Sequence, residues 1–123
     1  MIGGGLTIDT GAGDDIVSLQ ADIAHSMVVS LGTGDDQFEG LGLTIGLNAT
    51  IDSGDGNDEL LIAQSNVGYF LYVFLGAGDD LLEVTESDAR AAYLFGGLGV
   101  DELDVDAQTL AAVDFVFRTE FET

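Results

Sequence analysis

The chain has 123 residues, enough for one domain. Two basic residues stand against 23 acidic ones, and the net charge of -21 excludes a basic nucleic-acid-binding surface and a cationic anchor for anionic lipid. A hydrophobic fraction of 46% is too high for an acidic disordered tail, and the lack of cysteine excludes disulfides and thiolate metal sites.

A five-residue pattern, Gly-x-Gly-x-Asp, recurs along the chain at a spacing of 21 or 22 residues. It occupies residues 11–15, 32–36, 54–58, 76–80 and 97–101. Its glycines are Gly11, Gly13, Gly32, Gly34, Gly54, Gly56, Gly76, Gly78, Gly97 and Gly99, and its final aspartates are Asp15, Asp36, Asp58, Asp80 and Asp101. Each copy predicts a tight turn, because glycine permits positive φ and aspartate bonds nearby amides. The fixed period indicates a repeat protein.

Alternating apolar residues flank every turn. Three residues before the first glycine stand Ile8, Val29, Ile51, Val73 and Leu94, and six residues after it stand Val17, Phe38, Leu60, Leu82 and Leu103. This period of two predicts strands with one buried face on both sides of each turn. In the connection that follows, Ile23, Ile45, Val67 and Ala89 indicate a third short strand. A helix over residues 85–92 is the alternative there.

A unit of this length cannot bury its own apolar side, whereas stacked units can. We therefore expect an all-β fold, a right-handed parallel β-helix or β-roll solenoid of about five to six coils. It would form a single domain over residues 1–123. Residues 113–117 keep the strand alternation but no glycine turn follows them, so residues 113–123 are expected to cap the C-terminal end.

The fifth turn position is Asp in all copies, whereas the fourth position varies between Asp, Asn57 and Val100. A simple turn would accept Asn or Ser at the fifth position as well. Stacking would place the five carboxylates in a ladder with a spacing of about 5 Å, where they repel one another unless a cation lies between them. Ca²⁺ takes about six to eight oxygens, which carboxylates and glycine carbonyls of neighbouring turns can supply. We therefore expect Ca²⁺ to be bound by the five final aspartates and the ten glycines of the turns.

The turns resemble the RTX, or hemolysin-type, calcium-binding repeat Gly-Gly-x-Gly-x-Asp-x-U-x, where U is a large apolar residue. The resemblance implies that the fifth-position aspartates are calcium ligands and that Val17 and its equivalents are U. The first glycine of the family pattern is present only as Gly96. The period also exceeds the family's repeat of about nine residues, which implies one calcium column instead of two. The longer period is similar to that of acidic repeats in very large bacterial surface proteins.

These features predict a calcium-binding structural module of a secreted or cell-surface bacterial protein, and not an enzyme. No apolar run reaches the length of about 18 residues that crosses a membrane, so no membrane insertion is expected. Some side chains near the C-terminal end are expected to form an outward apolar surface, namely Tyr72, Phe74, Tyr93, Phe95 and Val116. This surface could be covered by flanking chain, could mediate a homo-oligomer, or could bind carbohydrate. The ends of the solenoid could also stack on one another. A carbohydrate-binding or carbohydrate-acting β-helix module is the alternative function.

Overall fold

A computed structural model describes residues 2–106 and 108–109, and the backbone of residues 115–119. Its strands form three parallel sheets. The first contains β1 (Leu6–Asp9), β4 (Met27–Ser30), β7 (Ala49–Asp52), β10 (Phe70–Phe74), β12 (Ala91–Phe95) and β14 (Phe115–Thr119). The second contains β2 (Ile16–Leu19), β5 (Gln37–Leu41), β8 (Glu59–Ala63), β11 (Leu81–Thr85) and β13 (Glu102–Val105). The third contains β3 (Asp22–Ile23), β6 (Thr44–Ile45) and β9 (Asn66–Val67).

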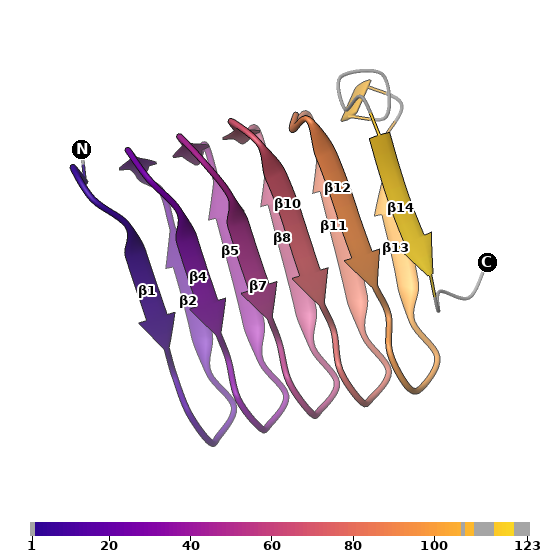
Figure 1. Cartoon of the computed structure of the whole chain (residues 1–123). Helices are drawn as coiled ribbons and strands as arrows, with labels where there is room; N and C mark the ends of the chain where they lie inside the picture. The colour runs from indigo at the N-terminus through magenta and orange to yellow at the C-terminus, as the bar shows by residue number, and fades with distance from the viewer. Residues whose placement is uncertain (1, 107, 110–114, 120–123) are drawn as a thin grey trace.

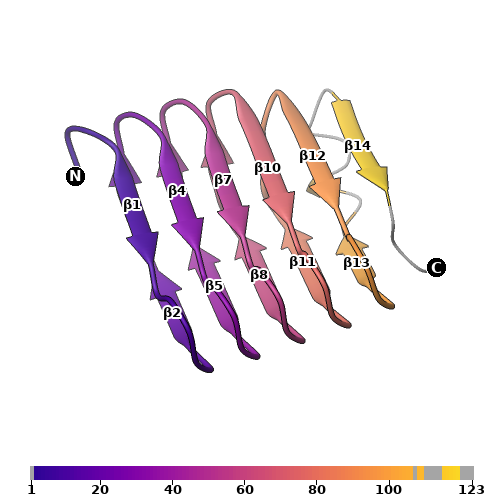
Figure 2. The same cartoon turned by 60° about the horizontal axis from the view of Figure 1, so that its bottom comes forward.

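The chain winds through the three sheets once per repeat. In Figure 1 the first sheet lies in front of the second, and the glycine turns that join them form a row along one edge; Figure 2 shows the same layering from a second direction. Neighbouring strands of each sheet are equivalents from adjacent repeats and pair in parallel, as in Leu6 with Met27 and Leu71 with Ala49. We number the coils one to five by the turns 11–15, 32–36, 54–58, 76–80 and 97–101. The parallel β-solenoid expected from the repeat is confirmed.

The core lies between the sheets and consists of columns of similar side chains. Val29, Ile51 and Val73, which precede the turns, have no exposed surface. Phe38, Leu60 and Leu82 follow the turns and face them from the second sheet, each at most 2% exposed. These residues occupy the inward positions that the alternation predicts, because successive side chains of a strand point to opposite faces.

The third side of each coil also follows the strand prediction. Ile23, Ile45, Val67 and Ala89 are buried in one column of the core. The first three lie in β3, β6 and β9, and Asn66 forms a bridge with Asp88 in the next repeat. The alternative of a helix over residues 85–92 is wrong: β11 ends at Thr85 and β12 begins at Ala91.

The C-terminal strand differs in register from the sequence expectation. The predicted cap strand at residues 113–117 is β14 at Phe115–Thr119, and Phe95 pairs with Thr119, an offset of 119 − 95 = 24 residues. Val116 therefore pairs with the buried Ala92 and not with one of the outward aromatic residues of β12. The side chain of Val116 lies outside the described residues, so its place in the outward apolar surface stays a prediction. The extra residues fall between β13 and β14, where no glycine turn fixes the length of the connection. The rest of the proposed cap, residues 113–114 and 120–123, lies outside the described residues.

Candidate metal centre

The turns stack so closely that glycine is required for two reasons. Gly54 and Gly56 have φ values of 78° and 129°, in the region that favours glycine. A Cβ on either would also collide with the carbonyl oxygen of Gly32 or Gly34 in the coil before. All ten predicted glycines have positive φ, and only Gly11 and Gly13, in coil one, would find open space for a Cβ. The glycine carbonyls of each coil therefore point at the next coil.

The fifth-position aspartates form an inner ladder that connects consecutive coils. From coil two onward, the Oδ1 atom of each accepts a hydrogen bond from the backbone N–H of the equivalent aspartate one coil earlier. These N···O distances are 2.8 Å for Asp15 to Asp36, 2.8 Å for Asp36 to Asp58, 2.7 Å for Asp58 to Asp80 and 2.9 Å for Asp80 to Asp101. The structure thus brings all five predicted aspartates into one column.

The fourth-position residues form an outer ladder of the opposite direction. The side chains of Asp14, Asp35, Asn57 and Asp79 each accept from a backbone N–H one coil later, at 2.8–2.9 Å. Any side chain with a suitable oxygen can do this, which explains Asn57. Val100 only donates its N–H, to Asp79. The variation at this position therefore has a structural cause.

The second carboxylate oxygen distinguishes the inner ladder from an ordinary turn. The Oδ2 atoms of Asp36, Asp58 and Asp80 are buried and have no hydrogen-bond partner. The side chains themselves are nearly inaccessible, with Asp36 and Asp58 each 1% exposed and Asp80 3% exposed. A buried polar atom without a partner is costly, and a buried charge without one costs more. Each of these aspartates therefore lacks one interaction that a proton or a cation would supply.

The carboxyl groups titrate accordingly. Burial raises the pKa of Asp58 from 3.8 to about 6, although the amide of Asp36 and the hydroxyl of Ser53 oppose the rise. Burial also raises the pKa of Asp80, to about 7, and the charges of Asp58 and Asp101 add to this effect. The pKa of Asp36 is raised for the same main reason. Because their pKa values are raised, these carboxyl groups favour the protonated form near neutral pH, and charging all of them together costs free energy.

The surroundings of the inner ladder suit a hard cation. A groove of about 490 Å³ borders both ladders in coils two to four and reaches Val100 and Glu102 in coil five. Within the described part of the chain, no cluster of three or more His, Cys, Asp or Glu is placed to hold a metal ion. A cation between two coils would therefore be held by two Oδ2 atoms and backbone carbonyls, the mixed oxygen set that Ca²⁺ accepts. The residues present fit such an ion.

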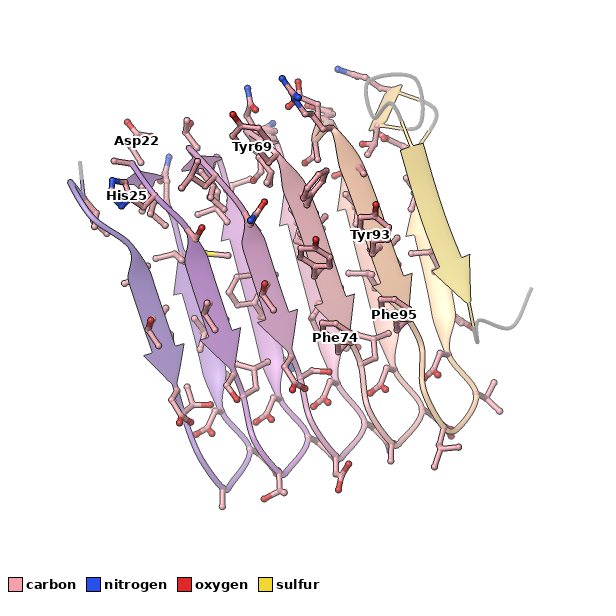
Figure 3. The ribbon with its side chains drawn as sticks, viewed as in Figure 1. Asp22, His25, Tyr69, Phe74, Tyr93 and Phe95 are labelled. Atoms are coloured by element: carbon pink, nitrogen blue, oxygen red, sulfur yellow. The ribbon has the colours of Figure 1, made fainter. Side chains whose placement is uncertain are left out.

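The outward aromatic residues form stacked columns on β10 and β12. The rings of Phe74 and Phe95 are 5.0 Å apart with an interplanar angle of 2°, and those of Tyr72 and Tyr93 are 5.2 Å apart at 14°. Figure 3 shows Phe74 and Phe95 side by side on neighbouring strands. Since the ring faces cover one another, this arrangement gives little support to sugar stacking. A homo-oligomer through this surface stays a prediction.

One buried ladder was missed from the sequence. The hydroxyl oxygens of Ser65, Ser87 and Thr109 accept from the backbone N–H groups of Leu43, Ser65 and Ser87, each at 3.1 Å. All three hydroxyl residues are buried, at most 7% exposed. Their spacing of 22 residues was a usable signal, but short polar residues in a connection are normally assigned to the surface.

The chain matches no known protein family, no curated protein and no solved structure. The resemblance to the RTX repeat therefore stays a prediction based on the turns. Within residues 2–106, 108–109 and 115–119, the structure contains no helix of the length and hydropathy that a membrane span needs.

Proposed function

We propose that this chain is a calcium-binding structural module in which Ca²⁺ bridges the stacked turns of a β-solenoid. The observation that carries the proposal is the column of buried Oδ2 atoms without partners at Asp36, Asp58 and Asp80. Asn in these positions would retain the ladder hydrogen bond, as Asn57 does in the outer ladder. Binding of a cation by the Oδ2 atom would explain why the fifth position of every turn is the charged Asp and not Asn.

Calcium is the cation that the oxygen set favours. Mg²⁺ requires near-ideal octahedral geometry and gives up its waters reluctantly, while Zn²⁺ prefers His and Cys ligands. The chain has one histidine and no cysteine. Two basic residues cannot neutralise 23 acidic ones, so cations bound in the turns would also reduce the repulsion that opposes folding.

A secreted or cell-surface location agrees with this role. Extracellular calcium-binding modules work with dissociation constants of about 10⁻⁴–10⁻³ M, which weak sites built from single carboxylate oxygens can reach. The resemblance to the RTX repeat and to the acidic repeats of bacterial surface proteins supports the same location. We propose a structural rather than a catalytic role, in which the metal supplies folding energy.

Calcium titration of the metal-free chain tests the proposal. Circular dichroism and the melting temperature should show gain of β structure or of stability, since a ligand that binds only the folded state adds about 2.7 kcal/mol at a hundredfold excess over its dissociation constant. Mg²⁺ at the same concentration should give a smaller change. If chelation and calcium addition leave both observables unchanged, the proposed function is wrong.

A further inference from the structure

Each glycine turn carries a second acidic residue next to the aspartate of its fifth position. In coils one, two and four this residue stands at the fourth position, and in coils three and five it stands at the sixth. No turn is acidic at both of these positions, and none lacks an acid at both. The second acids are Asp14, Asp35, Glu59, Asp79 and Glu102.

The fourth and sixth positions of a turn line the same groove. In coil three these positions hold Asn57 and Glu59, and in coil four they hold Asp79 and Leu81. Side chains of alternate residues in an extended chain point to the same side, so both positions lie outside while the residue between them points inward. The groove of about 490 Å³ therefore receives one surface carboxylate from each of coils two to five, whichever position supplies it.

The same groove borders the carboxylates that lack a partner. Asp36, Asp58 and Asp80 line it, are at most 3% exposed, and each have an Oδ2 atom without a hydrogen-bond partner. Coils two to four thus each combine one buried and one surface carboxylate at the groove. Together the two carboxylates of a coil carry the charge that balances one divalent cation.

The surface carboxylates lack the regularity of direct metal ligands. A direct ligand of Ca²⁺ holds its oxygen at about 2.3–2.6 Å from the ion, which restricts the position and length of its side chain. Here the second carboxylate changes sides around the fifth residue and varies between Asp and Glu. In the ranges that the structure describes, no three His, Cys, Asp or Glu side chains are grouped to hold an ion. The repeats therefore share a charge at the groove and not a fixed oxygen position.

We propose that the surface carboxylates of the groove are a second element of calcium binding, which acts by electrostatic attraction on ions held by the inner ladder. A carboxylate about 8 Å from a divalent ion still attracts it in water, and a groove with low-dielectric walls strengthens this attraction. The inference rests on the proposed function and deepens it, because it names residues that raise calcium affinity without contacting the ion. It also explains why the second acid can stand at either of two positions.

Moving the charge within one turn tests the proposal. Glu59→Gln removes the surface charge of coil three and keeps the shape of the side chain. The double variant Asn57→Asp, Glu59→Gln returns the charge at the fourth position. Asp is compatible with that position, because Asp35 and Asp79 accept the same type of ladder hydrogen bond there.

Glu39→Gln is the matched control for net charge. Glu39 is exposed in β5, two residues beyond the groove residue Gln37. Calcium binding to the wild type and each variant is measured by isothermal titration calorimetry at about 20 mM and about 500 mM salt, where the screening length is long and short respectively. The melting temperature in chelator reports effects on the fold alone. If Glu59→Gln does not fold, Glu102→Gln with and without Val100→Asp makes the same comparison in coil five.

At low salt, Glu59→Gln should weaken calcium binding about threefold to fivefold, whereas the double variant and Glu39→Gln should stay within about twofold of the wild type. At high salt the difference between Glu59→Gln and the wild type should disappear. A double variant as weak as Glu59→Gln would make Glu59 a position-specific ligand, and equal weakening by Glu39→Gln would assign the effect to net charge; either result overturns the inference. Unchanged affinity in Glu59→Gln at low salt would overturn it too, while leaving the proposed function intact. A wild type that binds no calcium would refute the proposed function itself.

Discussion

Without divalent cations, the solenoid should be more stable in mild acid than at neutral pH, the reverse of most proteins with charged carboxylates. The pKa of Asp58 is raised from 3.8 to about 6 in the folded chain, and that of Asp80 to about 7. The folded state therefore holds protons more tightly than the unfolded state. The stabilisation is complete below about pH 4 and is lost as the pH rises through about 6 to 7.

The size of the effect follows from the shift. A rise of about two pKa units at Asp58 corresponds to about 3 kcal/mol of stability that is present in acid and absent at neutral pH. The two carboxyls interact, so the contributions of Asp58 and Asp80 do not simply add. Domains of this size have free energies of unfolding of about 5–15 kcal/mol, so the loss is a large fraction of the total. It should lower the melting temperature by about 10 °C.

Thermal and urea unfolding, followed by circular dichroism in chelator between about pH 4 and pH 8, measures this directly. Millimolar calcium should restore stability at neutral pH and have less effect in acid, where protons compete for the same oxygens. Stability in chelator that is constant, or that rises with pH over this range, would refute the reasoning.

Two asparagine variants separate the buried carboxyl from the general surface charge. Asp58→Asn keeps the Oδ1 acceptor for Asp36 and removes the titrating group, so it should flatten the pH profile and stabilise the chelated protein at neutral pH. Calcium should raise the stability of the same variant less than that of the wild type. Asp79→Asn removes one charge from the exposed outer ladder and keeps its acceptor oxygen. If both variants change the pH profile equally, the pH dependence of stability comes from the net charge and not from the burial of the Asp58 carboxyl.

Three further predictions concern individual positions. Asp58→Asn should weaken calcium binding more than Asp15→Asn, because Asp58 borders two gaps between coils and Asp15 only one; equal losses in a calcium titration would contradict the ladder of sites. Gly56→Ala should destabilise the fold by about 1–3 kcal/mol more than Gly13→Ala, since both strain the backbone but only the former collides with the coil before it. Melting temperatures measure this, and similar values would show that the coils can separate freely. Ser65→Ala should cost about 1–3 kcal/mol in urea unfolding, because it leaves the buried N–H of Leu43 without its acceptor. No loss would mean that the N–H finds another partner.

Much of the fold could be predicted from the sequence because the same pattern of strand and turn residues recurs in every repeat. The period of 21 or 22 residues, the alternation around residues such as Val29 and Phe38, and the glycine turns each imply the same stacked coil. The positive φ of all ten turn glycines confirms the turn prediction. The prediction failed where the repeat ends: no turn fixes the connection to β14, so Val116 was placed in the wrong register.

The arrangement of each carboxylate was decided only by the tertiary structure. The partner of an aspartate oxygen lies about one coil away, and the sequence of a single coil does not say which neighbour its side chain faces. The structure directs the Oδ1 atoms of the inner ladder to the coil before and those of the outer ladder to the coil after. It also buries Asp58 Oδ2 without a partner. The sequence by itself thus determined that the turns stack and that an aspartate recurs in each. Stacking at a fixed spacing then decided which oxygens are satisfied by the backbone and which remain for a cation.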